Sequence, residues 1–170
     1  MSIMRVAAGA DAILDQCACF VDGLDDDQFV RPSKIVGGTI GMHMRHTLDH
    51  FRSAITTPCS DLIDYDHRER GGSLETCRTA TLAEITTLRS LIGGLDEPAM
   101  ASPMTACVMV SSDGQTAELG STRARELFFA MHHAIHHNAL VKAIGNEIGI
   151  TSDDCFGKAP STINFEHTGA

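Results

Sequence analysis

The chain has little of several residue types that mark particular classes of protein. It has no tryptophan, one tyrosine, and 13 lysines and arginines against 22 aspartates and glutamates, so its formal net charge is -9. Non-specific nucleic-acid binding needs clustered basic side chains, and the sequence has no such cluster, so we expect no nucleic-acid partner. No apolar run approaches the length of a membrane span. We therefore expect a cytoplasmic protein with no membrane partner.

The six cysteines also lack the spacing of a common metal or redox motif, because none of them forms a C-x-x-C pair. Cys17 and Cys19 are two residues apart, and on a helix their thiols would point about 200° apart. A chain of 170 residues can bury a core without disulfides. We expect reduced thiols and a single domain over residues 1–170.

Apolar residues spaced by three and four predict four amphipathic helices, over residues 3–24, 39–56, 73–93 and 121–145 approximately. Residues 104–119 instead hold two short apolar runs around Asp113-Gly114, which predicts a β-hairpin. Residues 57–72 have the composition of a polar loop. The sequence therefore predicts an all-α four-helix bundle with a small β-hairpin insertion before the last long helix.

The nine histidines are concentrated on two of these predicted helices. On the last helix, His133 and His137 are one turn apart and about 40° apart around the axis, on an arc that also carries apolar residues. They should point into the bundle, where a buried imidazole needs a partner. The HxxxH spacing alone is a weak signal of a metal site, and Ala134 stands where a zincin would need glutamate.

His43, His46 and His50 on the second helix strengthen the case, because they share an arc of about 60° beside the core stripe. His43 and His50 lie nearer the middle of the apolar arc, and His46 lies at its edge. Three neutral imidazoles with an open position are what a catalytic divalent metal needs. The alternative is that one or two of the three merely form hydrogen bonds or face solvent.

Two stretches of the chain resemble the signatures of the DinB/YfiT-like superfamily of metal-dependent enzymes, which includes bacillithiol- and mycothiol-dependent transferases: TIGMHMRHTLDHF (39–51) and RELFFAMHHAIHHNALVKAI (125–144). The resemblance implies an up-down-down-up bundle. It places metal ligands on His46, His133 and His137, with His50 as an additional or substitute ligand. It implies a divalent ion, with zinc and nickel both acceptable to imidazole, and a low-molecular-weight thiol as cosubstrate.

Two functions follow from these observations. One is a metal-dependent S-transferase or hydrolase, in which the ion activates a thiol or water against a small-molecule substrate; the other is a non-catalytic, stress-related metal-binding or sensing protein. No catalytic residue can be assigned. Glu126 and Asp49 either orient a ligand imidazole through its second nitrogen or are ordinary helix acids.

Two further surfaces carry weaker predictions. Phe128, Met131 and Ile135 form a second apolar stripe on the last helix, which predicts a homodimer through that face. Arg68 and Arg70 in the polar loop are candidates to bind an anionic substrate, although a charge-rich loop is usually just solvated.

Overall fold

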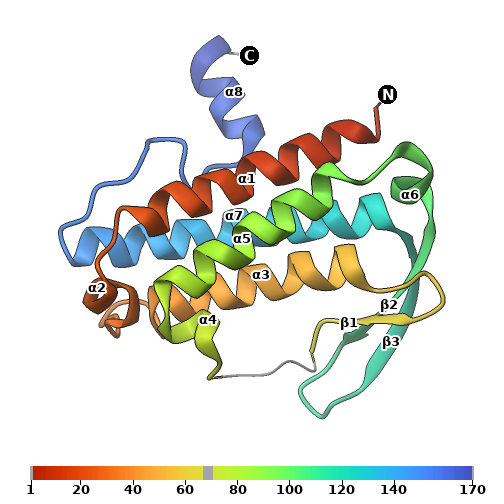
Figure 1. Ribbon diagram of the computed structural model, residues 1–170, viewed down its shortest axis with the longest axis horizontal. Helices are drawn as coiled ribbons and strands as arrows, with labels where there is room; N and C mark the ends of the chain where they lie inside the picture. Colours follow the sequence, from red (N-terminus) through yellow and green to blue (C-terminus); the bar gives the residue numbers. More distant parts are fainter. Residues whose placement is uncertain (1, 67–70, 170) are drawn as a thin grey trace.

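The computed structural model describes residues 2–66 and 71–169, and in these residues four long helices pack around one core (Figure 1). The elements in chain order are α1 (Met4–Asp22), α2 (Asp26–Val30), α3 (Ile40–Thr56), β1 (Leu62–Asp64), α4 (Ser73–Thr76), α5 (Arg78–Gly93), α6 (Glu97–Ala101), β2 (Pro103–Met109), β3 (Thr116–Thr122), α7 (Arg123–Glu147) and α8 (Pro160–Thr168).

The core lies between α1, α3, α5 and α7. Each of these helices contributes a fully buried leucine: Leu14, Leu48, Leu88 and Leu127. This agrees with the apolar stripes in the sequence, because a helix that buries one face must repeat its apolar residues every three or four positions. In the described part of the chain, no helix is both long and apolar enough to cross a membrane.

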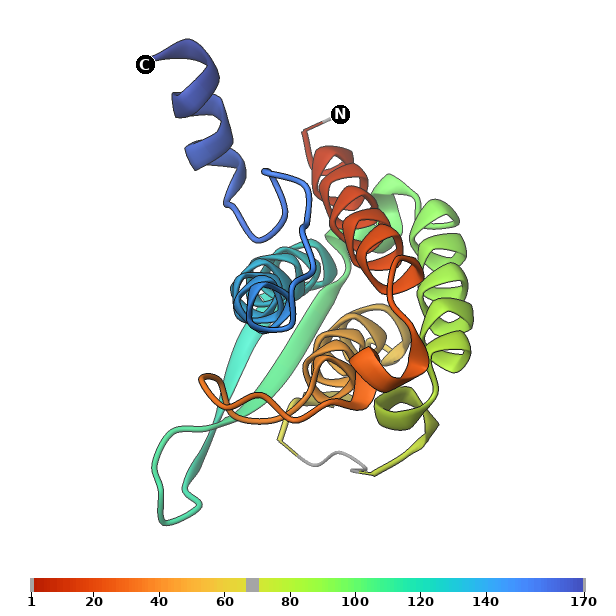
Figure 2. The same ribbon diagram turned by 90° about the vertical axis from the view of Figure 1, so that its left-hand side faces the viewer.

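The expected all-α class is wrong, because a three-stranded mixed sheet lies against the helices (Figure 2). β2 and β3 form an antiparallel hairpin, and β1 adds a strand parallel to β2, with Leu62 opposite Thr105. The sheet has its own small core, which includes Ile63 and Tyr65. The chain thus has a mixed helix-and-sheet fold, not the DinB/YfiT-like four-helix bundle with a hairpin insertion.

The strand β1 was not predicted from the sequence, because it is only three residues long and lies in a polar stretch. The signal was present: Ile63 and Tyr65 are buried, whereas Leu62 and Asp66 are exposed. This alternation is typical of a strand with one buried face. It is too short to stand out from the surrounding loop residues.

Two predicted helix boundaries also differ from the structure. The third predicted helix is broken at Cys77, where the backbone is extended (φ -126°), so α4 and α5 are separate. The last long helix begins at Arg123, because β3 continues to Thr122, and the Thr122 side chain accepts a hydrogen bond from the Arg125 backbone N–H. The polar cap at Thr122 sets the start of α7.

The second apolar stripe of α7 is largely covered within the chain. Met131 and Ile135 are buried in the core shared with α1, and only Phe128 stays exposed, at 39%. A homodimer through this face stays a prediction, now centred on Phe128. The short helix α8 projects away from the long helices in both views (Figures 1 and 2). Arg68 and Arg70 lie outside the described residues.

Candidate metal centre and adjoining pocket

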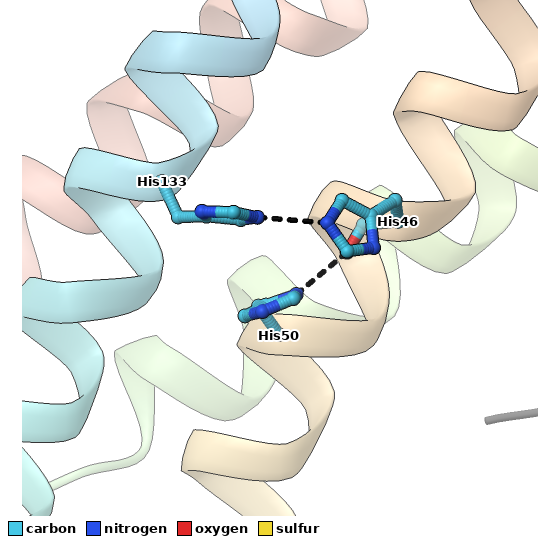
Figure 3. A group of neighbouring side chains, drawn as sticks. All are labelled: His46, His50 and His133. Atoms are coloured by element: carbon cyan, nitrogen blue, oxygen red, sulfur yellow. Dashed lines mark hydrogen bonds between the residues drawn. The ribbon is translucent and has the colours of Figure 1, made fainter. Parts of the chain in front are cut away.

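Three imidazoles from two helices converge beside the core (Figure 3). His46 and His50 come from α3, and His133 comes from α7. Their potential ligand atoms all lie within 4.8 Å of one another. The Nε2 atoms of His46 and His133 are 2.8 Å apart. Residues 87 positions apart in the chain thus meet at one point.

The backbone sets the protonation of His50. Its Nδ1 lies 2.9 Å from the carbonyl oxygen of His46, so Nδ1 carries the proton and donates to that oxygen. The lone pair is then on Nε2. A hydrogen bond from one ring nitrogen that orients the other is the usual arrangement around metal-binding histidines.

His137 lies beside this group rather than within it. Its ring centroid is 4.6 Å from those of both His46 and His133. The Nε2 of His43 lies 3.0 Å from the carbonyl oxygen of Gly37, and must donate to it, which leaves Nδ1 of His43 to accept from Nδ1 of His137 at 2.9 Å. The lone pair of His137 is therefore on Nε2, as a metal ligand requires.

Burial favours the neutral form of two imidazoles beside the group, those of His137 and His43. Burial, followed by the electrostatic effect of His133 and His43, lowers the pKa of His137 to about 3. Burial is also the largest cause that lowers the pKa of His43. Only a neutral imidazole offers a lone pair to a metal ion, so the lowered pKa keeps His137 able to coordinate one at neutral pH.

The donor set fits a divalent ion such as zinc or nickel. Ligand nitrogens about 2.0–2.1 Å from a tetrahedral zinc stand about 3.3 Å apart. The nitrogens in this cluster are separated by 2.8 Å in the closest measured pair and by no more than 4.8 Å within the group of three. Side-chain rotations that change these separations by up to about 1.5 Å would bring the nitrogens to that spacing. Imidazole suits both ions.

A pocket of about 290 Å³ opens between the sheet and α7, next to the histidines. Tyr65 and Phe129 line it. The Tyr65 ring stacks on His50, with centroids 5.0 Å apart and planes 10° apart. The Phe129 ring lies 5.8 Å from both His50 and His133. One layer of aromatic rings thus separates the pocket from the imidazoles.

The polar side of the pocket is built around Glu126, which is only 7% exposed. Tyr65 donates its hydroxyl to Oε2 of Glu126 at 2.8 Å, and Ser121 donates to Oε1. Burial, followed by the hydrogen bond to Glu126, raises the pKa of the Tyr65 hydroxyl, so this group stays protonated. Arg125 and apolar residues of β2 and β3 complete the lining.

The structure gives contacts for both predicted orienting carboxylates, and their role in orienting an imidazole stays a prediction. Glu126 accepts hydrogen bonds from Tyr65 and Ser121, and the ring of Tyr65 stacks on His50. Asp49 forms an ion pair with Arg45, one turn earlier on α3. Sequence reasoning missed Tyr65 and Ser121 altogether. Tyr65 shows the strand alternation noted above, whereas nothing local marks Ser121, which reaches Glu126 only because β3 leads directly into α7.

Comparison with known proteins gives one relative among curated proteins, "FK506-binding protein 5" of Rhizopus delemar, which is 30% identical over 140 residues. The match covers 82% of this chain and 32% of the relative, so the chain spans about one third of that protein's length. No family model and no solved structure matches the chain.

These findings overturn the expected membership in the DinB/YfiT-like superfamily. No family model supports it, and the relative has an unrelated name. The predicted thiol transferase or hydrolase function is wrong for the same reason, and the comparisons do not support the stress-related metal-binding or sensing alternative. The two quoted stretches together span only about 30 residues, which was too little to carry a family's function. The histidines themselves are a separate matter, since their placement comes from the structure.

Proposed function

We propose that the chain is a ligand-binding domain, which takes a small molecule in the pocket between the sheet and α7 and holds a divalent metal ion on the adjacent histidines. The observation that carries this is the shared aromatic layer. Tyr65 and Phe129 line the pocket on one side and contact His50 and His133 on the other. Small-molecule sites are typically such apolar clefts with a few buried polar groups.

The metal ligands in this proposal are His46, His50 and His133, with His137 as a fourth. The tautomers of His50 and His137 support the assignment, because the hydrogen bonds to their Nδ1 atoms direct the lone pair to Nε2. Zinc and nickel are the ions to test first. When bound, such an ion supplies a Lewis-acidic centre behind the pocket wall. We also propose a cytoplasmic location, which suits six cysteines that are all free.

Equilibrium dialysis against zinc or nickel tests the metal part of the proposal. We expect the unmodified protein to retain about one ion per chain. The His46→Ala/His133→Ala double variant should lose most of it, because the closest pair of nitrogens is gone. His132→Ala is the matched control, since His132 is exposed on the same helix. Full retention of metal by the double variant would refute the site.

A second candidate is the FK506 binding named in the relative, which the identity over 140 residues favours. FK506 is therefore a direct probe of this chain. Tyr65 is the only tyrosine and the chain has no tryptophan, so intrinsic emission reports on this one pocket residue. Saturable change in emission with FK506 would support this candidate. No change up to the solubility limit of the compound, together with no heat in calorimetry, would remove it.

A further inference from the structure

The pocket beside the histidines contains a buried carboxyl group, that of Glu126, which forms no ion pair with any of the residues that the structure describes. Glu126 is 7% exposed, and both hydrogen bonds that its oxygens accept come from neutral hydroxyls, those of Tyr65 and Ser121. A carboxylate has about four acceptor positions, so these two bonds leave capacity for another donor. Burying an ionised carboxylate without a counter-ion costs several kcal/mol in general. A cation in the pocket would offset that cost.

The other residues that line the pocket favour a cation with an apolar body. Phe129, Val108 and Leu119 give the pocket an apolar wall. The faces of Tyr65 and Phe129 attract positive charge through their π electrons. At about 290 Å³, the space suits a body of a few carbon atoms.

Among the residues that the structure describes, Arg125 is the basic residue that lines the pocket. It is exposed on α7, and its guanidinium lies 5.9 Å from the ring centroid of Phe128, which is not among the pocket residues. An exposed charge is screened by water and neutralises a buried carboxylate poorly. At the rim, however, Arg125 could bind an anionic group at the far end of a ligand.

We infer that the pocket binds a small organic ammonium compound, with the charged nitrogen at Glu126 and an apolar body against Phe129. This deepens the proposed function, on which it rests, by naming the chemical class of the ligand. An amine and an amino acid share this chemistry. They differ in whether a carboxylate is available to Arg125.

Four compounds with one branched body separate these possibilities: isoamylamine, leucine, 4-methylpentanoate and isoamyl alcohol. Isoamylamine carries an ammonium group, leucine carries an ammonium and a carboxylate, 4-methylpentanoate carries a carboxylate, and isoamyl alcohol is uncharged. None absorbs where tyrosine does, so the emission of Tyr65 reports binding directly. Each titration is done with the full chain, first with a chelator present to keep it free of metal and then after loading with metal. We expect isoamylamine or leucine, or both, to bind more tightly than the alcohol and the carboxylate.

The Glu126→Gln variant keeps the shape of the side chain and removes its charge. We expect this variant to bind the ammonium compounds about thirtyfold more weakly or worse, as when one partner of a buried charge pair is lost. Its affinity for the alcohol should not change. The Arg125→Gln variant shows whether the ligand is an amino acid or an amine. If the variant binds leucine more weakly and isoamylamine equally well, the ligand is an amino acid. If its affinity for both compounds is unchanged, the ligand is an amine.

Two results would overturn the inference. If the alcohol binds the unmodified protein as well as isoamylamine and leucine do, the pocket binds ligands but does not select a cation, and only the inference fails. This comparison needs no variant, so it stands even if Glu126→Gln does not fold. If none of the four compounds changes the Tyr65 emission with or without metal, the ligand pocket of the proposed function fails as well.

Discussion

Arg123 is the residue that most directly holds the two histidine-bearing helices together. It lies at the start of α7 and is buried, yet its guanidinium donates to the carbonyl oxygens of Ala54, Ile55 and Thr57 at the end of α3. The last carbonyls of a helix have no partners within the helix, and the helix dipole makes that end negative. One cation therefore satisfies three of these groups and ties α3 to α7.

Replacing Arg123 with methionine should lower the free energy of unfolding by about 3 kcal/mol, because hydrogen bonds to a charged donor are lost and the carbonyls stay buried. Urea denaturation followed by circular dichroism measures this. Arg125→Met is the control, since an exposed neighbour should change stability by less than about 0.5 kcal/mol. Equal losses in the two variants would show that Arg123 does not connect the helices as described.

At the scale of elements, α3 is positioned by a close approach to α4. Gly41 lies in the first turn of α3, and a Cβ built there would stand 2.1 Å from the carbonyl oxygen of Glu75 and 2.8 Å from the ring of Phe29. Only glycine allows the helix to lie this near to the neighbouring backbone. The contact fixes the N-terminal part of the helix that carries His43, His46 and His50.

Gly41→Ala should therefore destabilise the protein by about 2 kcal/mol or more, as overpacking does. Gly93→Ala is a matched control: it lies at the end of α5 with no atom within 4 Å of an added Cβ, and alanine favours helix. Thermal melting distinguishes the two. A Gly41→Ala variant that melts at or above the temperature of the unmodified protein would contradict the packing of α4 on α3.

Helical periodicity is enough to predict which faces of α3 and α7 meet, but it does not predict the whole site. The sequence assigned His46, His133 and His137 as ligands, with His46 chosen by the family resemblance because it lies at the edge of the apolar arc. In the structure His46 and His133 converge with His50, the substitute ligand, and their binding of a metal stays a prediction. The pocket could not be predicted this way. Tyr65 reaches His50 only because β1 pairs with β2, and Ser121 reaches Glu126 only because β3 runs into α7. Strands that pair across about 40 positions of the chain, such as β1 and β2, have no local sequence pattern that would predict the pairing.

At the scale of the whole molecule, the two halves of the proposed function depend on different layers. The imidazoles lie between α3 and α7, whereas the pocket lies between α7 and the sheet. α7 belongs to both, because Glu126, Phe129 and His133 lie on nearly the same face of this helix, within two turns of one another. If the proposed function is right, α7 connects the proposed metal site to the proposed ligand pocket, and displacement of α7 should disturb both.

The X-ray absorption spectrum of the zinc-loaded protein tests most directly whether the imidazoles of α3 and α7 hold the ion together. We predict a first shell of nitrogen at about 2.0–2.1 Å, three or four atoms in number, with the outer-shell scattering of imidazole. The same spectrum of the His46→Ala/His133→Ala variant should lose this pattern. The chain offers six free cysteines as competing ligands. A sulfur shell at about 2.3 Å, or a shell of oxygen alone, would contradict the account.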